Sequence, residues 1–128
     1  MNAEDIYSLL KSDGISEEYA NGPLKKFFRF GLPSGTSHEL LYLRREGAPG
    51  GDLNGEIGLH PKFADLAQQF REISGVKVKG DSEGISLKRS SNMREFPPVG
   101  GKSSSFLYFP IVVESEEALW RVLKLIQA

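Results

Sequence analysis

The residues best suited to bind an anion lie in the segment 88–98. This segment combines three basic side chains with two serines and an asparagine. Loops on a rigid sheet often carry binding groups, and an arginine fork matches a carboxylate or a phosphate. With one histidine and one lysine from outside the segment, they give a candidate binding set: His60, Arg89, Ser91, Asn92, Arg94 and Lys102. The alternative is an ordered surface loop whose serines and asparagine cap its own turns.

Two glycine-rich stretches come close to catalytic motifs, and both have the wrong spacing. A phosphate-binding loop ending at 101–103 would need a glycine at position 96, where Phe96 stands. A strand is also expected after Ser103, so no helix N-terminus would face a phosphate. The stretch 31–35 has the order G-x-x-S-G instead of the G-x-S-x-G of a nucleophile elbow. We therefore predict no catalytic residue among known motifs, and an enzyme is the less favoured class.

The chain offers few metal ligands and no thiol chemistry. It has no cysteine, which excludes disulfides, thiolate nucleophiles and thiolate metal sites. Its two histidines, His38 and His60, lack the spacing of known zinc motifs. We expect no metal and no cofactor, and we interpret His60 before Pro61 as a residue that packs or caps at a helix start.

Bases and aromatic residues alternate in the segment 25–30, Lys-Lys-Phe-Phe-Arg-Phe. This combination can stack nucleobases and neutralise phosphates. It is equally typical of an edge strand with one packed face and one solvated face. Phe27 and Phe28 cannot both point to the same side of a strand, so the segment predicts either a bulge or an exposed phenylalanine. An exposed phenylalanine would favour a binding surface.

Composition and charge indicate one globular domain, residues 1–128. The chain has 39% hydrophobic and 26% charged residues, which is ordinary for a globular protein. It has no apolar run long enough to cross a bilayer, and its acidic N-terminus does not resemble a secretory signal. The net charge of −1 argues against a dedicated nucleic-acid binder. We expect a cytoplasmic protein with no membrane partner.

Charge is distributed along the chain in blocks. Residues 1–22 sum to −4, residues 23–45 to +4, residues 46–76 to −3 and residues 77–102 to +3. Such blocks predict that the fold displays a basic face and an acidic face. An alternative binding surface is therefore an acidic patch near the N-terminus: Glu4, Asp5, Asp13, Glu17 and Glu18.

Three helices are expected from capping residues and apolar spacing. The first covers residues 3–11 behind Asn2, and the last follows Ser115. The middle helix starts at Pro61, carries apolar residues at helical spacing from 63 to 73, and ends with Gly75 at the C′ position.

Strands are expected at 24–30, 40–44, 53–59 and 106–113, with a hairpin formed by 76–79 and 85–88 and a long loop at 89–105. The strands at 40–44 and 53–59 should pair antiparallel, and Pro110 indicates an edge or a bulge. The expected fold is α+β: a mainly antiparallel sheet of about five to six strands, packed by three helices.

Several short motifs occur in an order that resembles the YgaC-like family of small bacterial proteins of unknown function. They are Gly58-Leu59-His60-Pro61, Ser91-Asn92-Met93 with Phe96-Pro97, Gly101-Lys102, and a final helix that begins Ser115-Glu116-Glu117-Ala118-Leu119. The resemblance covers residues 39–126 and differs in the N-terminal part and in the glycine-rich loop at 47–55. It implies a single α+β domain, and it brings no catalytic residues.

Three classes of function fit the sequence. The first is a protein-binding module, for instance an immunity or inhibitor protein that blocks a toxin or nuclease by charge complementarity. The second is a domain that binds nucleic acid or an anionic ligand through the basic segment 88–102. The third is an enzyme in which His60 acts as a base beside Arg94 or Lys102. We favour the first class because it requires least of the residues present. Oligomeric state is not predicted.

Overall fold

The described residues of the chain form three α-helices and one antiparallel sheet. The computed structural model describes residues 1–17, 26–32, 40–45, 53–78, 87–90, 96–99 and 102–127, with backbone alone for residues 89–90, 98–99 and 102–105. The helices are α1 (Ala3–Ser12), the 3-10 helix η1 (Pro61–Leu66), α2 (Ala67–Arg71) and α3 (Glu116–Ile126). The strands are β1 (Ser16–Glu17), β2 (Phe27–Gly31), β3 (Leu40–Arg44), β4 (Gly55–Leu59), β5 (Val76–Val78), β6 (Lys88–Ser90), β7 (Pro98–Val99) and β8 (Lys102–Val113).

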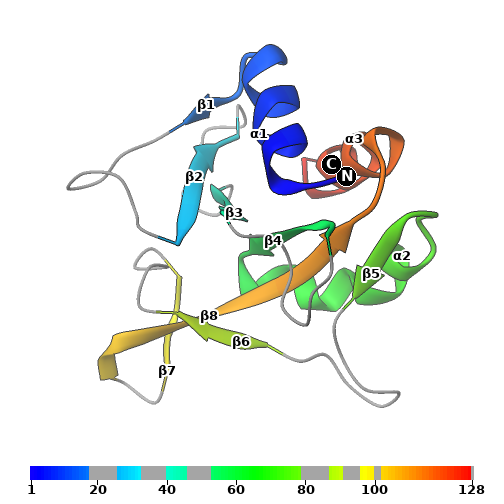
Figure 1. Cartoon of the computed structure of the whole chain (residues 1–128). Helices are drawn as coiled ribbons and strands as arrows, with labels where there is room; N and C mark the ends of the chain where they lie inside the picture. The colour runs from blue at the N-terminus through cyan, green and yellow to red at the C-terminus, as the bar shows by residue number, and fades with distance from the viewer. Residues whose placement is uncertain are drawn as a thin grey trace.

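The sheet has the strand order β1-β2-β3-β4-β8-β5, and β6 and β7 also pair with β8. Neighbouring strands are antiparallel at every pairing between described residues. The expected α+β class and the antiparallel pairing of 40–44 with 53–59 are therefore confirmed. The long strand β8 crosses the molecule and joins the helix-covered part of the sheet to β6 and β7 (Figure 1).

One face of the sheet builds the main core. Side chains alternate along a strand, so Leu43, Ile57 and Ile111, which lie opposite one another in the register, point to the same side. This side packs against α1, η1, α2 and α3, and the buried residues of all four helices belong to one cluster with it. The molecule is thus a two-layer structure whose helices cover a single face.

The caps predicted at Asn2 for α1 and at Ser115 for α3 are both confirmed. The Asn2 side chain accepts a hydrogen bond from the Asp5 amide at 2.9 Å, and the Asp5 carboxylate accepts one from the Asn2 amide at 3.2 Å. The Ser115 hydroxyl accepts a hydrogen bond from the Ala118 amide at 3.2 Å. Each cap satisfies amides that the first helical turn leaves without an intrahelical partner.

The helix predicted from Pro61 is only partly correct. Its first six residues form η1, and the α-helical part α2 ends at Arg71. Apolar residues three positions apart also face the same way in a 3-10 helix, so the spacing did not distinguish the two conformations. Gly75 has a φ of +87° but lies beyond the helix, so the prediction of a C′ position is wrong.

The predicted hairpin of 76–79 with 85–88 is wrong. β5 and β6 both pair antiparallel with β8, Val78 opposite Ile111 and Lys88 opposite Tyr108. Two strands that are both antiparallel to a third run in the same direction, so they cannot form a hairpin with each other. The residues between them, 79–86, lie outside the described part of the chain.

The region 89–113 is more regular than expected. The predicted loop 89–105 contains part of β6, all of β7 and the first residues of β8. β8 as a whole is not an edge strand, since it lies between β4 and β5 in the sheet, but neither β5 nor β6 pairs with Pro110 itself. Pro110 pairs with Gly58, and on β8 it lies between the residues paired by β5 and those paired by β6.

Candidate functional site

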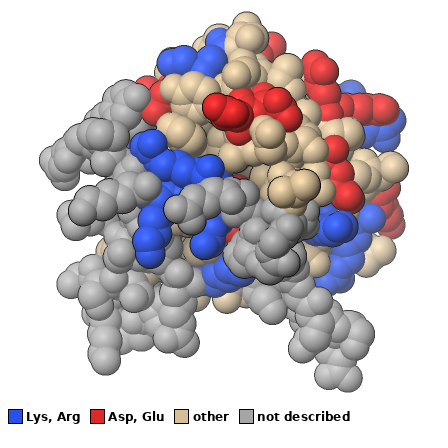
Figure 2. Space-filling view, in the orientation of Figure 1, with Lys and Arg blue, Asp and Glu red and all other residues tan. Residues whose placement is uncertain are grey.

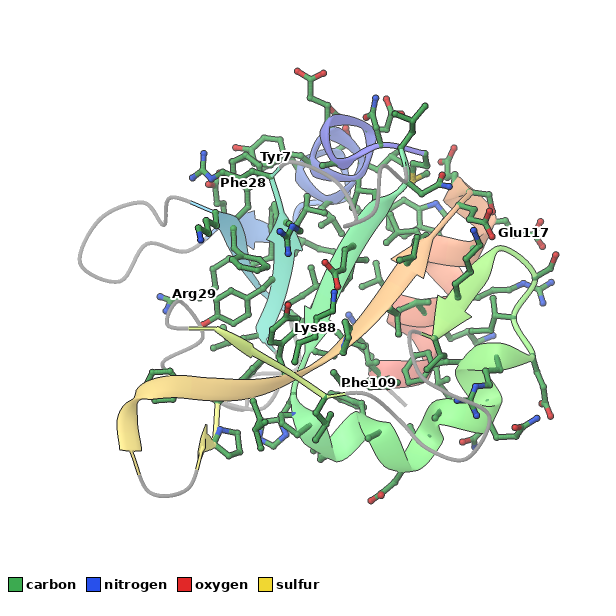
Figure 3. The ribbon with its side chains drawn as sticks, turned by 60° about the horizontal axis from the view of Figure 1, so that its bottom comes forward. Tyr7, Phe28, Arg29, Lys88, Phe109 and Glu117 are labelled. Atoms are coloured by element: carbon green, nitrogen blue, oxygen red, sulfur yellow. The ribbon has the colours of Figure 1, made fainter. Side chains whose placement is uncertain are left out.

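The face of the sheet that points away from the helices, called here the second face, carries aromatic and charged side chains. The register places Tyr42 opposite Gly58 and Glu56 opposite Val112, on the side away from Ile57. A separate cluster of buried residues lies on this side: Phe27, Tyr42, Phe96, Phe106 and Tyr108. Arg29 and Lys88, which belong to this face, are labelled in Figure 3. The second face is therefore neither bare nor purely apolar.

Three charged residues on the second face form an ion cluster: Arg44, Glu56 and Lys88. Glu56 has no exposed surface, although it carries a charge. Lys88 Nζ donates to Glu56 Oε1 at 2.7 Å, and Arg44 Nη1 lies 3.5 Å from Glu56 Oε2. The two cations come from β6 and β3, on either side of the glutamate. A buried carboxylate requires such partners, because its transfer from water without them costs several kcal/mol.

Tyr108 lies beside the ion cluster and is 2% exposed. Burial, with a further contribution from the negative charge of Glu56, raises the pKa of Tyr108 to about 12, while the charge of Arg44 and a side-chain hydrogen bond with it act in the opposite direction. The phenol is therefore neutral at physiological pH and cannot serve as a phenolate.

Arg29 is the second buried charged residue, at 9% exposure. It lies opposite Tyr42, which precedes Arg44 by two positions on the same face. Diagonal neighbours in a sheet are about 7–8 Å apart, so the two arginines belong to one region of positive charge. This places Arg29 and the ion cluster on the same surface.

Phe28 points to the opposite side from Phe27, as the sequence predicts, but it is not a bare exposed phenylalanine. The guanidinium of Arg45 lies 4.0 Å from the centre of the Phe28 ring, and the Tyr7 ring lies 4.5 Å away on centroids. Phe28 is half-buried between them. The interleaved segment thus supplies packing and a cation–π contact.

His60 lies next to the aromatic cluster of the second face. Its Nδ1 accepts a hydrogen bond from the Lys62 amide at 3.0 Å, which caps η1 as the sequence predicts. Its ring packs edge-on against Phe96, with centroids 5.3 Å apart. His60 therefore contacts a residue of the basic segment, through an apolar contact and not a charged one.

The other members of the predicted binding set are placed only in part. Arg89 lies in β6 opposite Leu107, and Lys102 lies at the start of β8, five residues from Leu107. At about 3.3 Å per residue, their backbones are on the order of 17 Å apart along the strand. Ser91, Asn92 and Arg94 lie outside the described residues.

The structure describes four of the five residues of the predicted acidic patch. Asp5 serves in the cap of α1, and Glu17 accepts a hydrogen bond from Tyr7 while lying 3.9 Å from Lys11. Glu4 and Asp13 are exposed. Glu18 lies outside the described residues.

The sequence interpretation missed the ion cluster. Lys88 belongs to the basic segment 88–98 but lies outside the predicted binding set. Arg44 continues the alternation that begins with Leu40 and Tyr42, and this alternation was the available signal. Glu56 lies within an apolar strand, where a charged residue indicates either an edge or a paired buried charge.

Basic side chains gather on one part of the surface in the view of Figure 2. Lysine and arginine side chains lie over β2 and β3, while the acidic side chains over α1 and α3 are mixed with basic ones. The prediction of a basic face and an acidic face stays a prediction.

Comparison with family models, with curated proteins and with solved structures finds no match to this chain. Among the described residues, no helix is long and apolar enough to cross a membrane. Within the same residues, no group of three or more histidines and carboxylates is arranged to hold a metal ion.

Proposed function

We propose that this chain is a small protein-binding module that docks an acidic surface of a partner protein on its second face. The observation that carries the proposal is the position of Arg44 and Lys88. Both cations lie on the face without helices, and about 30% of each side chain reaches solvent. A basic surface of this kind steers an oppositely charged partner and fixes its orientation.

A protein partner fits this face better than a single-stranded nucleic acid. Nucleic-acid binding without sequence preference uses exposed aromatic rings on which bases stack. On the second face, the described aromatic residues Phe27, Tyr42, Phe106 and Tyr108 are at most 9% exposed. The net charge of −1 also disfavours a polyanion.

A toxin or nuclease inhibited by this module in the cytoplasm is the partner type we propose first. An inhibitor of this kind needs no catalytic residue, only a complementary surface that covers the active site of its partner. The resemblance to the YgaC-like family stays a prediction and assigns no activity. The acidic residues near the N-terminus and the basic segment 88–102 stay alternative contact surfaces.

The proposal is tested by affinity capture from the cells that express the chain, with wild type, Lys88→Ala and Lys124→Ala as baits. Lys124 is an exposed lysine on α3, so its removal changes the net charge equally without touching the second face. We expect an acidic protein in a 1:1 complex, reduced at least about tenfold by Lys88→Ala and unchanged by Lys124→Ala.

Equal loss of the partner in both lysine variants, or recovery of nucleic acid in place of protein, would contradict the proposal. Circular dichroism spectra of the three baits show whether each variant is folded. Light scattering of the purified complex gives its stoichiometry.

A further inference from the structure

Arg44 and Lys88 approach one carboxylate from two strands. Lys88 Nζ contacts Glu56 Oε1 at 2.7 Å, and Arg44 Nη1 is 3.5 Å from Oε2. Glu56 Oε2 is buried and makes no hydrogen bond to the described residues. The buried carboxylate therefore holds the charged groups of both cations close to the surface of the sheet.

The two cations have more donors than Glu56 can use. An ammonium group has three donors and a guanidinium has five, while one carboxylate offers two oxygens. The exposed fractions of the two side chains are 31% for Arg44 and 30% for Lys88, against 0% for Glu56. Arg44 also makes a side-chain hydrogen bond with Tyr108. The donors that remain lie on the exposed parts of the two side chains, where a second anion can approach.

The charge of the cluster indicates which anion fits. Two cations and one carboxylate sum to +1, which a carboxylate group of charge −1 neutralises. A phosphate dianion would leave an excess of negative charge close to Glu56, and like charges at short range repel. We propose that Arg44 and Lys88 form a carboxylate-binding site, and that Glu56 positions both cations and sets the preference for a carboxylate over a phosphate dianion.

This inference rests on the proposed function, since it names the group of the acidic partner that the second face receives. The carboxylate can come from an aspartate or glutamate side chain or from a chain terminus. Both sources present the same planar pair of oxygens, which a guanidinium fork and an ammonium group can contact together.

The test is a nuclear magnetic resonance titration of the purified chain at pH 8 and constant ionic strength. The probes are N-acetylglutamate amide for a side-chain carboxylate, N-acetylalanine for a terminal carboxylate, and inorganic phosphate. We expect saturable shifts at Arg44 and Lys88 with one or both carboxylate probes. Lys88→Met should weaken the binding at least fivefold, and Lys124→Met should leave it unchanged.

The second measured quantity is the ratio of the dissociation constants for phosphate and carboxylate, compared between wild type and Glu56→Gln. The substitution raises the cluster charge from +1 to +2, so we expect phosphate to gain on carboxylate at least fivefold. Arg44→Gln lowers the charge to zero and should move the ratio in the opposite direction. Because the two variants test opposite directions, the experiment remains decisive even if Glu56→Gln does not fold.

An absence of saturable shifts at Arg44 and Lys88 would overturn the carboxylate site. A ratio that neither variant moves would overturn the role of Glu56. Either failure can be told apart from a failure of the proposed function. Partner capture measures docking of a protein on the second face and does not depend on which small anion binds there.

Discussion

Glu56 is a carboxylate with no exposed surface, placed between two cations on the second face. Buried ion pairs contribute little net stability compared with apolar residues, but removing one partner is costly because a charge is left uncompensated. A buried ionic group can contribute to a unique structure or to a function. The position of Arg44 and Lys88 at the surface is consistent with the second role.

Replacement of Glu56 by glutamine should lower the free energy of unfolding by about 2 kcal/mol. This is below the ~3–5 kcal/mol found for fully buried pairs, because both cations here reach water. Urea denaturation measures the difference. The matched control is Glu117→Gln, which breaks an exposed pair with Arg121 at 2.9 Å and should cost less than about 0.5 kcal/mol. Equal losses in the two variants would contradict the importance of burial at Glu56.

Tyr108 should make the protein less stable in alkali. Because the pKa of Tyr108 is raised from 10.0 to about 12, the folded state holds this proton after the unfolded state has released it. The stabilisation is complete below pH 10 and is lost as pH rises to about 12, at roughly 1.4 kcal/mol per pH unit. Tyr108→Phe should lack this component.

Absorbance at 295 nm against pH, compared between wild type and Tyr108→Phe, isolates the titration of Tyr108 from that of the other three tyrosines. A difference curve with its midpoint at pH 10 would contradict the raised pKa. Urea denaturation at pH 9 and pH 11 measures the corresponding change in stability.

At the level of residues, the sequence predicted single caps well and the cluster poorly. Asn2, Ser115 and His60 act on amides two or three positions away, so their partners are visible in the sequence itself. Glu56 and Lys88 are 32 positions apart and meet only because β4 and β6 both pair with β8. Contacts of this kind depend on sheet topology, which local patterns do not specify.

At the level of elements, the segment after β4 shows that apolar spacing predicts which residues are buried but not the type of helix. Phe63, Ala67 and Phe70 are buried on one side, as the spacing predicts, although half of the segment is a 3-10 helix. Burial of a stripe determines which residues face the core, whereas the hydrogen-bond pattern depends on local geometry at the ends. The error over the hairpin has a different origin, because two short β-prone segments separated by a glycine-rich stretch are typical of hairpins.

Gly75 and Gly14 provide a test of how closely the turn before β5 packs against the start of α3. Both have positive φ, +87° and +78°, so alanine is strained at either position. A Cβ at Gly75 would also lie 3.1 Å from the Ala118 Cβ and 3.1 Å from the Ser115 Oγ, whereas a Cβ at Gly14 has nothing within 4 Å. Gly14→Ala should cost about 1 kcal/mol, and Gly75→Ala should cost at least about 1 kcal/mol more.

Thermal and urea unfolding of the two glycine variants measure this difference directly. Similar losses for both would show that crowding against Ser115 and Ala118 adds nothing, and that α3 can move away from the turn without cost.

At the level of the whole molecule, the blocks of charge in the sequence correspond to surfaces in space. The basic block 23–45 contains β2 and β3, and the next basic block contains β6. These strands contribute Arg29, Arg44 and Lys88 to one face. The fold class follows from composition and periodicity, while the meeting of these three cations on one face depends on the strand order. The helices cover the other face, and on the second face the side chains of Arg44 and Lys88 reach solvent.

The central claim is that the partner docks on the second face, and site-directed photo-crosslinking in cells tests it most directly. A photoreactive amino acid replaces either Leu87, which is 37% exposed and adjoins Lys88, or Lys124, which lines a depression beside α3. The account predicts a single crosslinked protein from position 87, lost when Lys88→Ala is added, and none from position 124. A crosslinked product from position 124 alone would contradict it.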